Sequence, residues 1–175
     1  ISSSQQPSQG CNFDTALSSK FLNSKESKMK FHSEEYIQRD AEFGRILDLA
    51  SKGAKQVLIV SPDKIDSLDD SLKYALDEKT AKELKKNRKA TTTNSSGELI
   101  ELYLETGKTK SDFKKGNILL PWTSELDTHQ RLKDPRGIDT YYIPHSGPGT
   151  TKAAGLKVKD ELSAYIESNP DSSAL

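Results

Sequence analysis

The stretch Gln56-Val57-Leu58-Ile59-Val60-Ser61-Pro62 is a continuous apolar run, rich in β-branched residues, that stops abruptly at a serine and a proline. Continuous apolarity is typical of a strand that is buried on both faces, as strands of parallel sheets are. Ser61 is a favourable helix cap and Pro62 suits a first helical turn, so a helix is expected to follow directly. This order of strand and helix indicates an α/β fold.

The same order recurs on both sides of this stretch. Strands are expected at 56–60, 90–93, 117–120 and 138–143, and helices at 33–53, 61–76, 80–89, 95–107, 123–134 and 154–169. The helix at 95–107 is predicted because Ser95 and Glu98 have the spacing of a capping box. Alternating strands and helices favour a parallel sheet, and right-handed crossovers would bring every strand's carboxyl end to one edge.

The predicted fold class is therefore α/β, a three-layer Rossmann-like domain with a small, mostly parallel four-stranded sheet and helices on both faces. A chain of 175 residues suffices for one such domain. We expect the domain to span 31–170, after a flexible Ser/Gln-rich tail at 1–30 and before a short C-terminal tail at 171–175.

Composition excludes several classes of function. Lys plus Arg and Asp plus Glu both number 26, so the basic excess of a general nucleic-acid binder is absent. No apolar run has the roughly 18 residues of a membrane-spanning helix. One cysteine, Cys11, rules out an intramolecular disulfide framework and leans the localisation toward a reducing cytoplasm without deciding it.

Small hydroxyl residues and glycines follow the predicted strands. Loops of this kind at the carboxyl edge of an open α/β sheet present backbone amides to anions. The predicted ligand-binding residues are Ser95, Ser96, Gly97, Trp122, Ser146, Gly147, Gly149, Thr150, Thr151 and Lys152. The same residue types are also good helix caps, Lys152 can be a solvated first-turn lysine, and Trp122 is either a stacking platform or a core residue.

The longest of these loops carries a resemblance. Residues 139–150 resemble the strand and Pro-Gly-Gly-x-Gly-Thr loop of the nucleotide-hydrolysing proteins related to lysine-decarboxylase-like phosphoribohydrolases. Gly147, Gly149 and Thr150 match, Ser146 replaces the first glycine, and Ala153 stands where that family has an acidic residue. Residues 94–98 are similar to Ser-rich turns of sugar-phosphate isomerase domains. Both resemblances imply contact with a phosphate group.

Three side chains are candidates for proton transfer. His145 lies just past a predicted strand end beside the Gly-rich loop, and its ordinary pKa is near neutrality. Asp63 and Glu98 lie in strand-end loops and are candidates for paired catalytic carboxylates. The alternatives are a surface histidine and two first-turn helix charges. Without a second histidine nearby or a suitable cysteine, no metal site is predicted.

The sequence predicts a protein that binds, and potentially turns over, a phosphorylated small molecule, a nucleotide or sugar phosphate, at the carboxyl edge of the sheet. The alternative is a non-catalytic protein-interaction module whose charged helices form the partner surface, since one fold hosts both kinds of function. No membrane partner is expected. Cofactor, reaction and oligomeric state are left open by the sequence.

Overall fold

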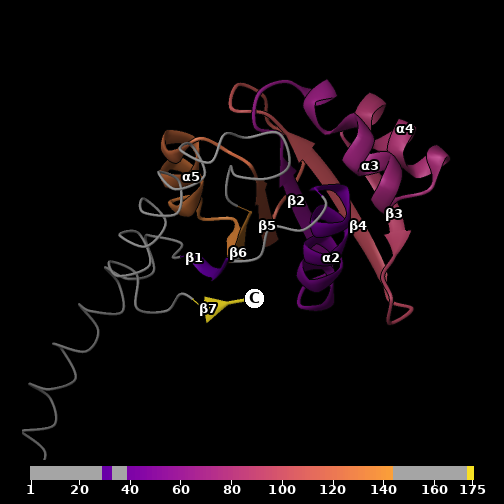
Figure 1. Cartoon of the computed structure of the whole chain (residues 1–175), viewed down its shortest axis with the longest axis horizontal. Coiled ribbons are helices and arrows are strands. Elements are labelled where there is room, and N and C mark those ends of the chain that lie inside the picture. The colour runs from indigo at the N-terminus through magenta and orange to yellow at the C-terminus, as the bar shows by residue number, and fades with distance from the viewer. Residues whose placement is uncertain (1–28, 33–38, 144–172) are drawn as a thin grey trace, which may run out of the picture.

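The structure is a computed structural model that describes residues 29–32, 39–143 and 173–175 (Figure 1). Its helices are α2 (Arg39–Lys52), the 3-10 turn η1 (Ile65–Leu68), α3 (Asp69–Ala75), α4 (Glu78–Asn87) and α5 (Glu125–Leu132). Its strands are β1 (Met29–His32), β2 (Gln56–Val60), β3 (Lys89–Thr93), β4 (Leu99–Glu105), β5 (Gly116–Pro121), β6 (Gly137–Ile143) and β7 (Ser173–Ala174).

The described strands form one sheet in the order β3-β4-β2-β5-β6-β1-β7. Only β3 and β4 pair antiparallel, and all other neighbours run parallel. The predicted α/β class with a mostly parallel sheet is thus confirmed, whereas the predicted number of four strands is wrong. Strands β2 to β6 lie within 39–143, and the short strands β1 and β7 fall largely where the sequence suggested tails.

Helices cover the sheet on both faces, which gives three layers. Helices α2, α3 and α4 lie along one face (Figure 1), where Phe43, Leu72 and Leu84 join a core with Val57 and Ile59 of β2. A smaller core on the opposite face includes Leu132 of α5 together with the inward side chains of β2, β5 and β6. Central strands therefore have no solvent-facing side, as their continuous apolarity predicted.

The prediction for β2 is confirmed at Gln56–Val60, and Ser124 caps α5 by accepting a hydrogen bond from the backbone N–H of Asp127. Helix α4 also forms where a helix was expected, although it begins at Glu78 with Asp77 as its cap. The helix after β2 begins later than predicted. Ser61 bonds the carbonyl of Lys64 in a loop, and helical structure starts only at η1.

The predicted helix at 95–107 is wrong. Residues 99–105 form β4, and Asn94–Glu98 is the turn of a β3–β4 hairpin in which Gly97 has a φ of 82°. Asn94 accepts the backbone N–H groups of Ser96 and Glu98, and its carbonyl accepts that of Gly97. This is a three-residue hairpin loop with a glycine in the left-handed conformation. The residue types that favour such a loop also occur in a capping box, so the sequence pattern suits both structures.

Other predicted features lie outside the described residues, namely the Ser33 cap and the last helix at 154–169. Among the described helices, none has the length and apolarity that crossing a membrane requires.

Candidate functional site

At the carboxyl edge of the sheet, the direction in which the chain winds reverses between the neighbouring parallel strands β2 and β5. After β2 the chain crosses to β4 on one side, and after β5 it crosses to β6 on the other side. In open α/β sheets, ligands bind in the crevice outside the carboxyl ends of two strands at which the direction of winding reverses. The ends of β2 and β5 therefore define the first place to look for a site.

Trp122, the residue directly after β5, has an unusual backbone conformation. Its φ is 55°, which a bulky residue adopts only at a cost of order 1–3 kcal/mol. Its N–H donates to the carbonyl of Ile143 at the end of β6, at 2.9 Å, and this bond holds the strained turn against the neighbouring strand. Backbone strain of this kind is concentrated at functional sites.

The indole of Trp122 is largely buried, with 7% of the residue exposed. It stacks on Phe43, with ring centroids 6.1 Å apart and an interplanar angle of 27°. The guanidinium carbon of Arg39 lies 4.1 Å from the centroid of the Trp122 ring. The ring thus acts as a core side chain that also supports a cation, and Arg39 occupies the position that a stacked base or sugar would need.

Arg39 is the exposed first residue of α2, and it makes no ion pair with any residue in the described ranges. A guanidinium can donate two parallel hydrogen bonds to an oxyanion. Arg39 is therefore a cation beside the Trp122 ring whose donors are taken up by no acidic side chain of the described residues.

The other described groups at this edge are polar. Asp63 lies exposed in the loop after β2. Ser61 is buried, and its N–H donates to the carbonyl of Glu105. Thr123 is buried and shares a hydrogen bond with Thr128 in α5 at 2.7 Å. Among the described residues, the carboxyl edge thus combines the guanidinium of Arg39, which has no ion pair, with the exposed carboxylate of Asp63.

The turn containing Ser95, Ser96, Gly97 and Glu98 lies at the opposite edge of the sheet, because it precedes β4 rather than following a parallel strand. The five residues of β2 separate the two edges by about 16 Å. Ser95 directs both its N–H and its hydroxyl to the carboxylate of Asp48, at 2.9 and 2.7 Å. The other three amides of the turn bond to Asn94, so all four are already occupied.

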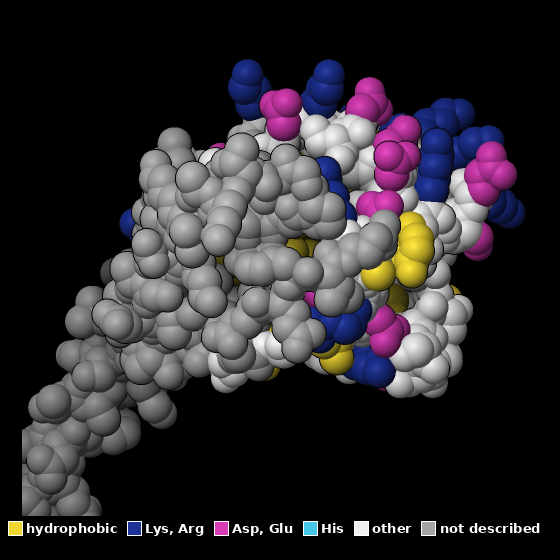
Figure 2. All heavy atoms as spheres, viewed as in Figure 1, with side chains coloured by type: hydrophobic (Ala, Val, Ile, Leu, Met, Phe, Trp, Pro, Cys, Tyr) yellow, Lys and Arg dark blue, Asp and Glu magenta, His cyan; other side chains and the backbone are white. Residues whose placement is uncertain are grey.

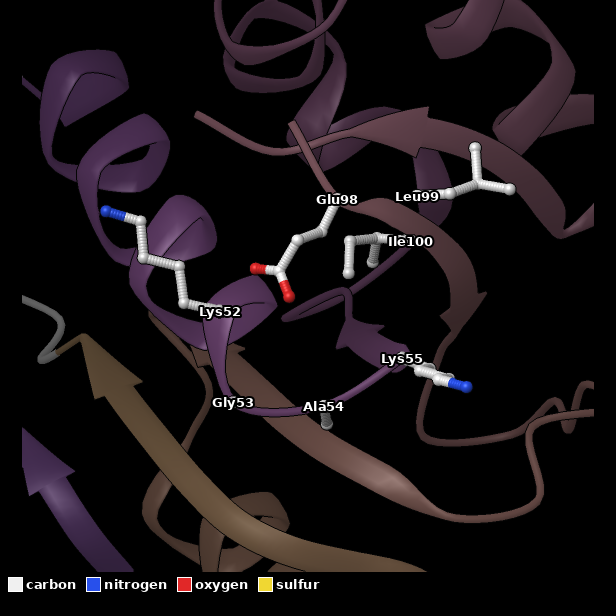
Figure 3. Close-up of a pocket in the computed structure, with 7 residues that line it drawn as sticks. All are labelled: Lys52, Gly53, Ala54, Lys55, Glu98, Leu99 and Ile100. Carbon is white, nitrogen blue, oxygen red and sulfur yellow. The ribbon is translucent and has the colours of Figure 1, made fainter. Parts of the chain in front are cut away.

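A groove of about 560 Å³ lies at this amino edge, between the end of α2 and the start of β4 (Figure 3). Its lining residues are Lys52, Gly53, Ala54, Lys55, Glu98, Leu99 and Ile100. Glu98 extends toward the end of α2, whereas Lys55 and Leu99 point away from it (Figure 3). Glu98 accepts a hydrogen bond from the neutral amide of Asn94, and Lys52 pairs with Asp48 at 3.3 Å, so Lys55 is the lining cation without an ion pair to a described residue.

A second concentration of charge is buried beneath α5. Glu105, at the end of β4, is fully buried and accepts hydrogen bonds from Arg131 at 2.7 Å and from Arg136 at 2.9 Å. Ser111 donates to the same carboxylate from both its N–H and its hydroxyl. Asp134 pairs with Arg136 at 2.7 Å. These charges neutralise one another, so the network holds α5 and the connection 106–115 on the sheet.

This network changes the titration of Glu105. Burial alone would raise the pKa of the carboxyl, but the hydrogen bonds from Arg136, Ser111 and Arg131 outweigh burial and lower the pKa to about 2. Because the folded pKa lies below the ordinary value of 4.5, Glu105 stabilises the fold above about pH 4.5. That contribution, roughly 3 kcal/mol, is lost as the pH falls from the ordinary value through the folded one.

We therefore expect Glu105→Gln to be less stable than the wild type at neutral pH, and we expect this difference in stability to become smaller in acid. The difference in free energy of unfolding between the wild type and Glu105→Gln should be largest near neutral pH and smaller by roughly 3 kcal/mol near pH 2. Urea unfolding at several pH values measures this difference. Glu83→Gln, an exposed glutamate of α4, is the matched control and should show a small difference at every pH. A constant deficit for Glu105→Gln would contradict the lowered pKa.

The predicted site residues are thus divided by the structure. Asp63 and Trp122 lie at the carboxyl edge, whereas Ser95, Ser96, Gly97 and Glu98 lie at the amino edge. The remaining predicted residues lie outside the described ranges, namely His145, Ser146, Gly147, Gly149, Thr150, Thr151 and Lys152. Arg39 was not predicted, because no sequence pattern relates it to a tryptophan 83 positions further on.

Among the described residues, no group of three or more His, Cys, Asp or Glu side chains is arranged to hold a metal ion. The chain matches no family model, no curated protein and no solved structure.

Proposed function

We propose that this protein binds a phosphorylated small molecule, a nucleotide or a sugar phosphate, at the carboxyl edge of its sheet between the ends of β2 and β5. The observation that carries the proposal is the guanidinium of Arg39 on the ring of Trp122, 4.1 Å from the ring centroid. This cation is exposed, oriented by the ring and without an ion pair to a described residue.

The chemistry of a phosphate group suits this arrangement. A phosphate oxyanion accepts two parallel hydrogen bonds from one guanidinium, and such charge-assisted bonds are about twice as strong as neutral ones. The ring orients the guanidinium before the ligand arrives, which reduces the entropy lost on binding. The position of the pair beside the β2–β5 switch point supports a ligand rather than a purely structural role.

Turnover of the bound molecule would require a group that transfers protons. Asp63 is the candidate at the described edge, where it lies exposed in the loop that follows β2. His145 remains the candidate predicted from the sequence, two residues beyond the described end of β6. Binding and turnover are separate proposals, and binding is the one supported by the geometry of Arg39.

The test is ligand-induced stabilisation, read as the melting shift produced by a panel of nucleotides and sugar phosphates. A ligand at 100 times its Kd stabilises the folded state by about 2.7 kcal/mol, which raises the melting temperature by several degrees. Arg39→Ala should lower the affinity for the responding ligand by about 10- to 100-fold, because it removes charged hydrogen bonds. Arg39→Lys should also lose affinity, since an ammonium keeps the charge but not the planar pair of donors.

Lys55→Ala is the matched control, because it removes an exposed cation from the groove at the amino edge. Its ligand-induced shift should equal that of the wild type. Loss of the shift in Lys55→Ala with retention in Arg39→Ala would move the site to the amino-edge groove. A flat response of the wild type to the whole panel would reject phosphate binding.

A further inference from the structure

Strand β3 ends the sheet on one side and offers an unpaired row of main-chain groups. Its register with β4 pairs Thr91 with Glu101, and hydrogen bonds join Leu104 to Arg88 and Asn94 to Glu98. Since bonded pairs alternate along an antiparallel ladder, the even-numbered residues of β3 bond to β4. The N–H and C=O groups of Lys89, Thr91 and Thr93 therefore point away from the sheet.

These outward groups are accessible within the part of the chain that the structure describes. Lys89, Thr91 and Thr93 are all exposed, and none of them has a further interaction that would occupy its outer main-chain groups. Protein sheets commonly protect such an edge by keeping the strand short, or with a proline, a bulge or a charged side chain, often lysine. Strand β3 has an unbroken register with β4 and contains no proline. Its one charged residue is Lys89.

The surroundings of β3 are basic at one end. The segment 79–89 contains the six cations Lys79, Lys82, Lys85, Lys86, Arg88 and Lys89 and the single anion Glu83. Figure 2 shows Lys and Arg side chains projecting among Asp and Glu side chains over α3 and α4. Three of the cations have acidic partners, since Lys82 pairs with Glu78, Lys85 with Asp69, and Lys89 with Glu101.

Lys86 and Arg88 make no ion pair with a described residue, and both lie next to the start of β3. The far end of the strand differs, because Thr91 and Thr93 are neutral and Thr91 lies opposite Glu101 of β4. A strand added outside β3 would thus meet the cations Lys86 and Arg88, which have no acidic partner among the described residues, beside the Lys89 end and β-branched neutral residues along the rest.

We propose that β3 is a docking strand for an extended segment of a partner protein, with acidic residues at the end beside Lys86 to Lys89 and β-branched residues along Thr91 and Thr93. The segment would bond to the outer groups of Lys89, Thr91 and Thr93 and extend the sheet by one strand. Threonine and valine pair well across neighbouring strands. The proposal concerns a surface away from Arg39 and is independent of phosphate binding.

A second copy of this chain is the competing occupant, and charge disfavours it. Pairing two β3 strands about a two-fold axis would bring together the two α4 helices, which pack on β3. Each α4 carries Lys79, Lys82, Lys85 and Lys86 against Glu78 and Glu83, an excess of two positive charges. Like charges brought together in this way repel, whereas an acidic segment is attracted.

The probes are two capped seven-residue peptides in which valine and threonine alternate. One has two glutamates at its N-terminus and the other has them at its C-terminus, because the added strand can run in either direction along β3. We expect one of the two peptides to bind. Its titration should produce saturable NMR chemical-shift changes and slowed hydrogen exchange at the amides of Lys89, Thr91 and Thr93. N-methylation of the peptide amides that face β3 should abolish binding, and methylation of the alternate set should not. A lysine-ended peptide should bind at least tenfold more weakly.

The matched protein variants are Thr91→Pro and Thr91→Val, each checked for folding by its melting temperature. Proline removes only an outward N–H and is tolerated on an edge strand, whereas valine keeps that N–H. Thr91→Pro should weaken peptide binding about tenfold or more, and Thr91→Val should not. Equal binding to both variants, or no saturable shift with either glutamate peptide, overturns the proposal. Concentration-dependent self-association that protects the same three amides assigns β3 to a second copy and also overturns it.

Discussion

Replacing Glu105 by alanine is expected to lower the free energy of unfolding by about 3 to 5 kcal/mol. The carboxylate is fully buried and accepts hydrogen bonds from Arg131, Arg136 and Ser111. Its removal leaves two guanidinium groups with reduced compensation in a poorly hydrated site, and uncompensated buried charge is among the largest costs that a single substitution produces. Guanidinium chloride unfolding, followed by circular dichroism, measures the loss.

Glu83→Ala provides the matched control, because Glu83 is exposed on α4 and its replacement should change stability by no more than about 0.5 kcal/mol. Glu105→Ala combined with Arg136→Ala should cost less than the sum of the two single changes, since the residues belong to one network. Additive costs, or a loss below about 1 kcal/mol for Glu105→Ala, would show that the network does not hold α5 to the sheet.

Gly116→Ala is the second substitution with a large expected effect. A Cβ atom on Gly116 would lie 2.0 Å from the backbone carbonyl oxygen of Gln56 in β2. The clash is with main chain in a central pair of strands, so it cannot be relieved by turning a side chain. We expect a loss of about 3 kcal/mol or failure to fold, at or beyond the upper end of what overpacking usually costs.

Gly44→Ala is the control, and it is expected to raise the free energy of unfolding where Gly116→Ala lowers it. Gly44 lies inside α2, where a Cβ atom would make ordinary contacts with Tyr74 and Ala75 at 3.6 to 3.8 Å. Alanine has a higher helix propensity than glycine, so this variant should gain about 0.5 to 1 kcal/mol. Thermal and denaturant unfolding of the two variants, measured in parallel, tests both the expected loss of stability and the expected gain. A stable Gly116→Ala protein would contradict the close approach of β5 to β2.

The strands β2, β5 and β6 and the start of α5 could be predicted because their signals are local. The apolar run at 56–60 determines a buried strand wherever the chain places it, and Ser124 caps α5 through an N–H three residues away. The hairpin at 94–98 could not be separated from a helix start, because Ser, Asn, Gly and Glu suit both. Pairing of 99–105 with both β2 and β3 decided the outcome.

The candidate site was predicted in part. Trp122 was expected at the carboxyl edge and lies there, with its ring in the core rather than open on both sides. Arg39 could not be expected, since its contact depends on α2 packing against the end of β5. The turn 95–98 was assigned to the same edge because its strand was taken to end there, and the hairpin reverses that assignment.

The amino-acid sequence by itself determined the fold class and the positions of β2, β5 and β6, because apolar periodicity and helix caps act over a few neighbouring residues. Tertiary structure alone decided which polar groups meet. Glu105 and Arg131 are 26 residues apart in the chain, and Asp48 reaches Ser95 across 47. Such contacts depend on sheet order and helix packing, so their residues carry no common local pattern. The stretch that begins at Gln56 therefore indicates a parallel sheet, while the tertiary structure places Arg39 on Trp122 and leaves β3 at the edge of the described sheet.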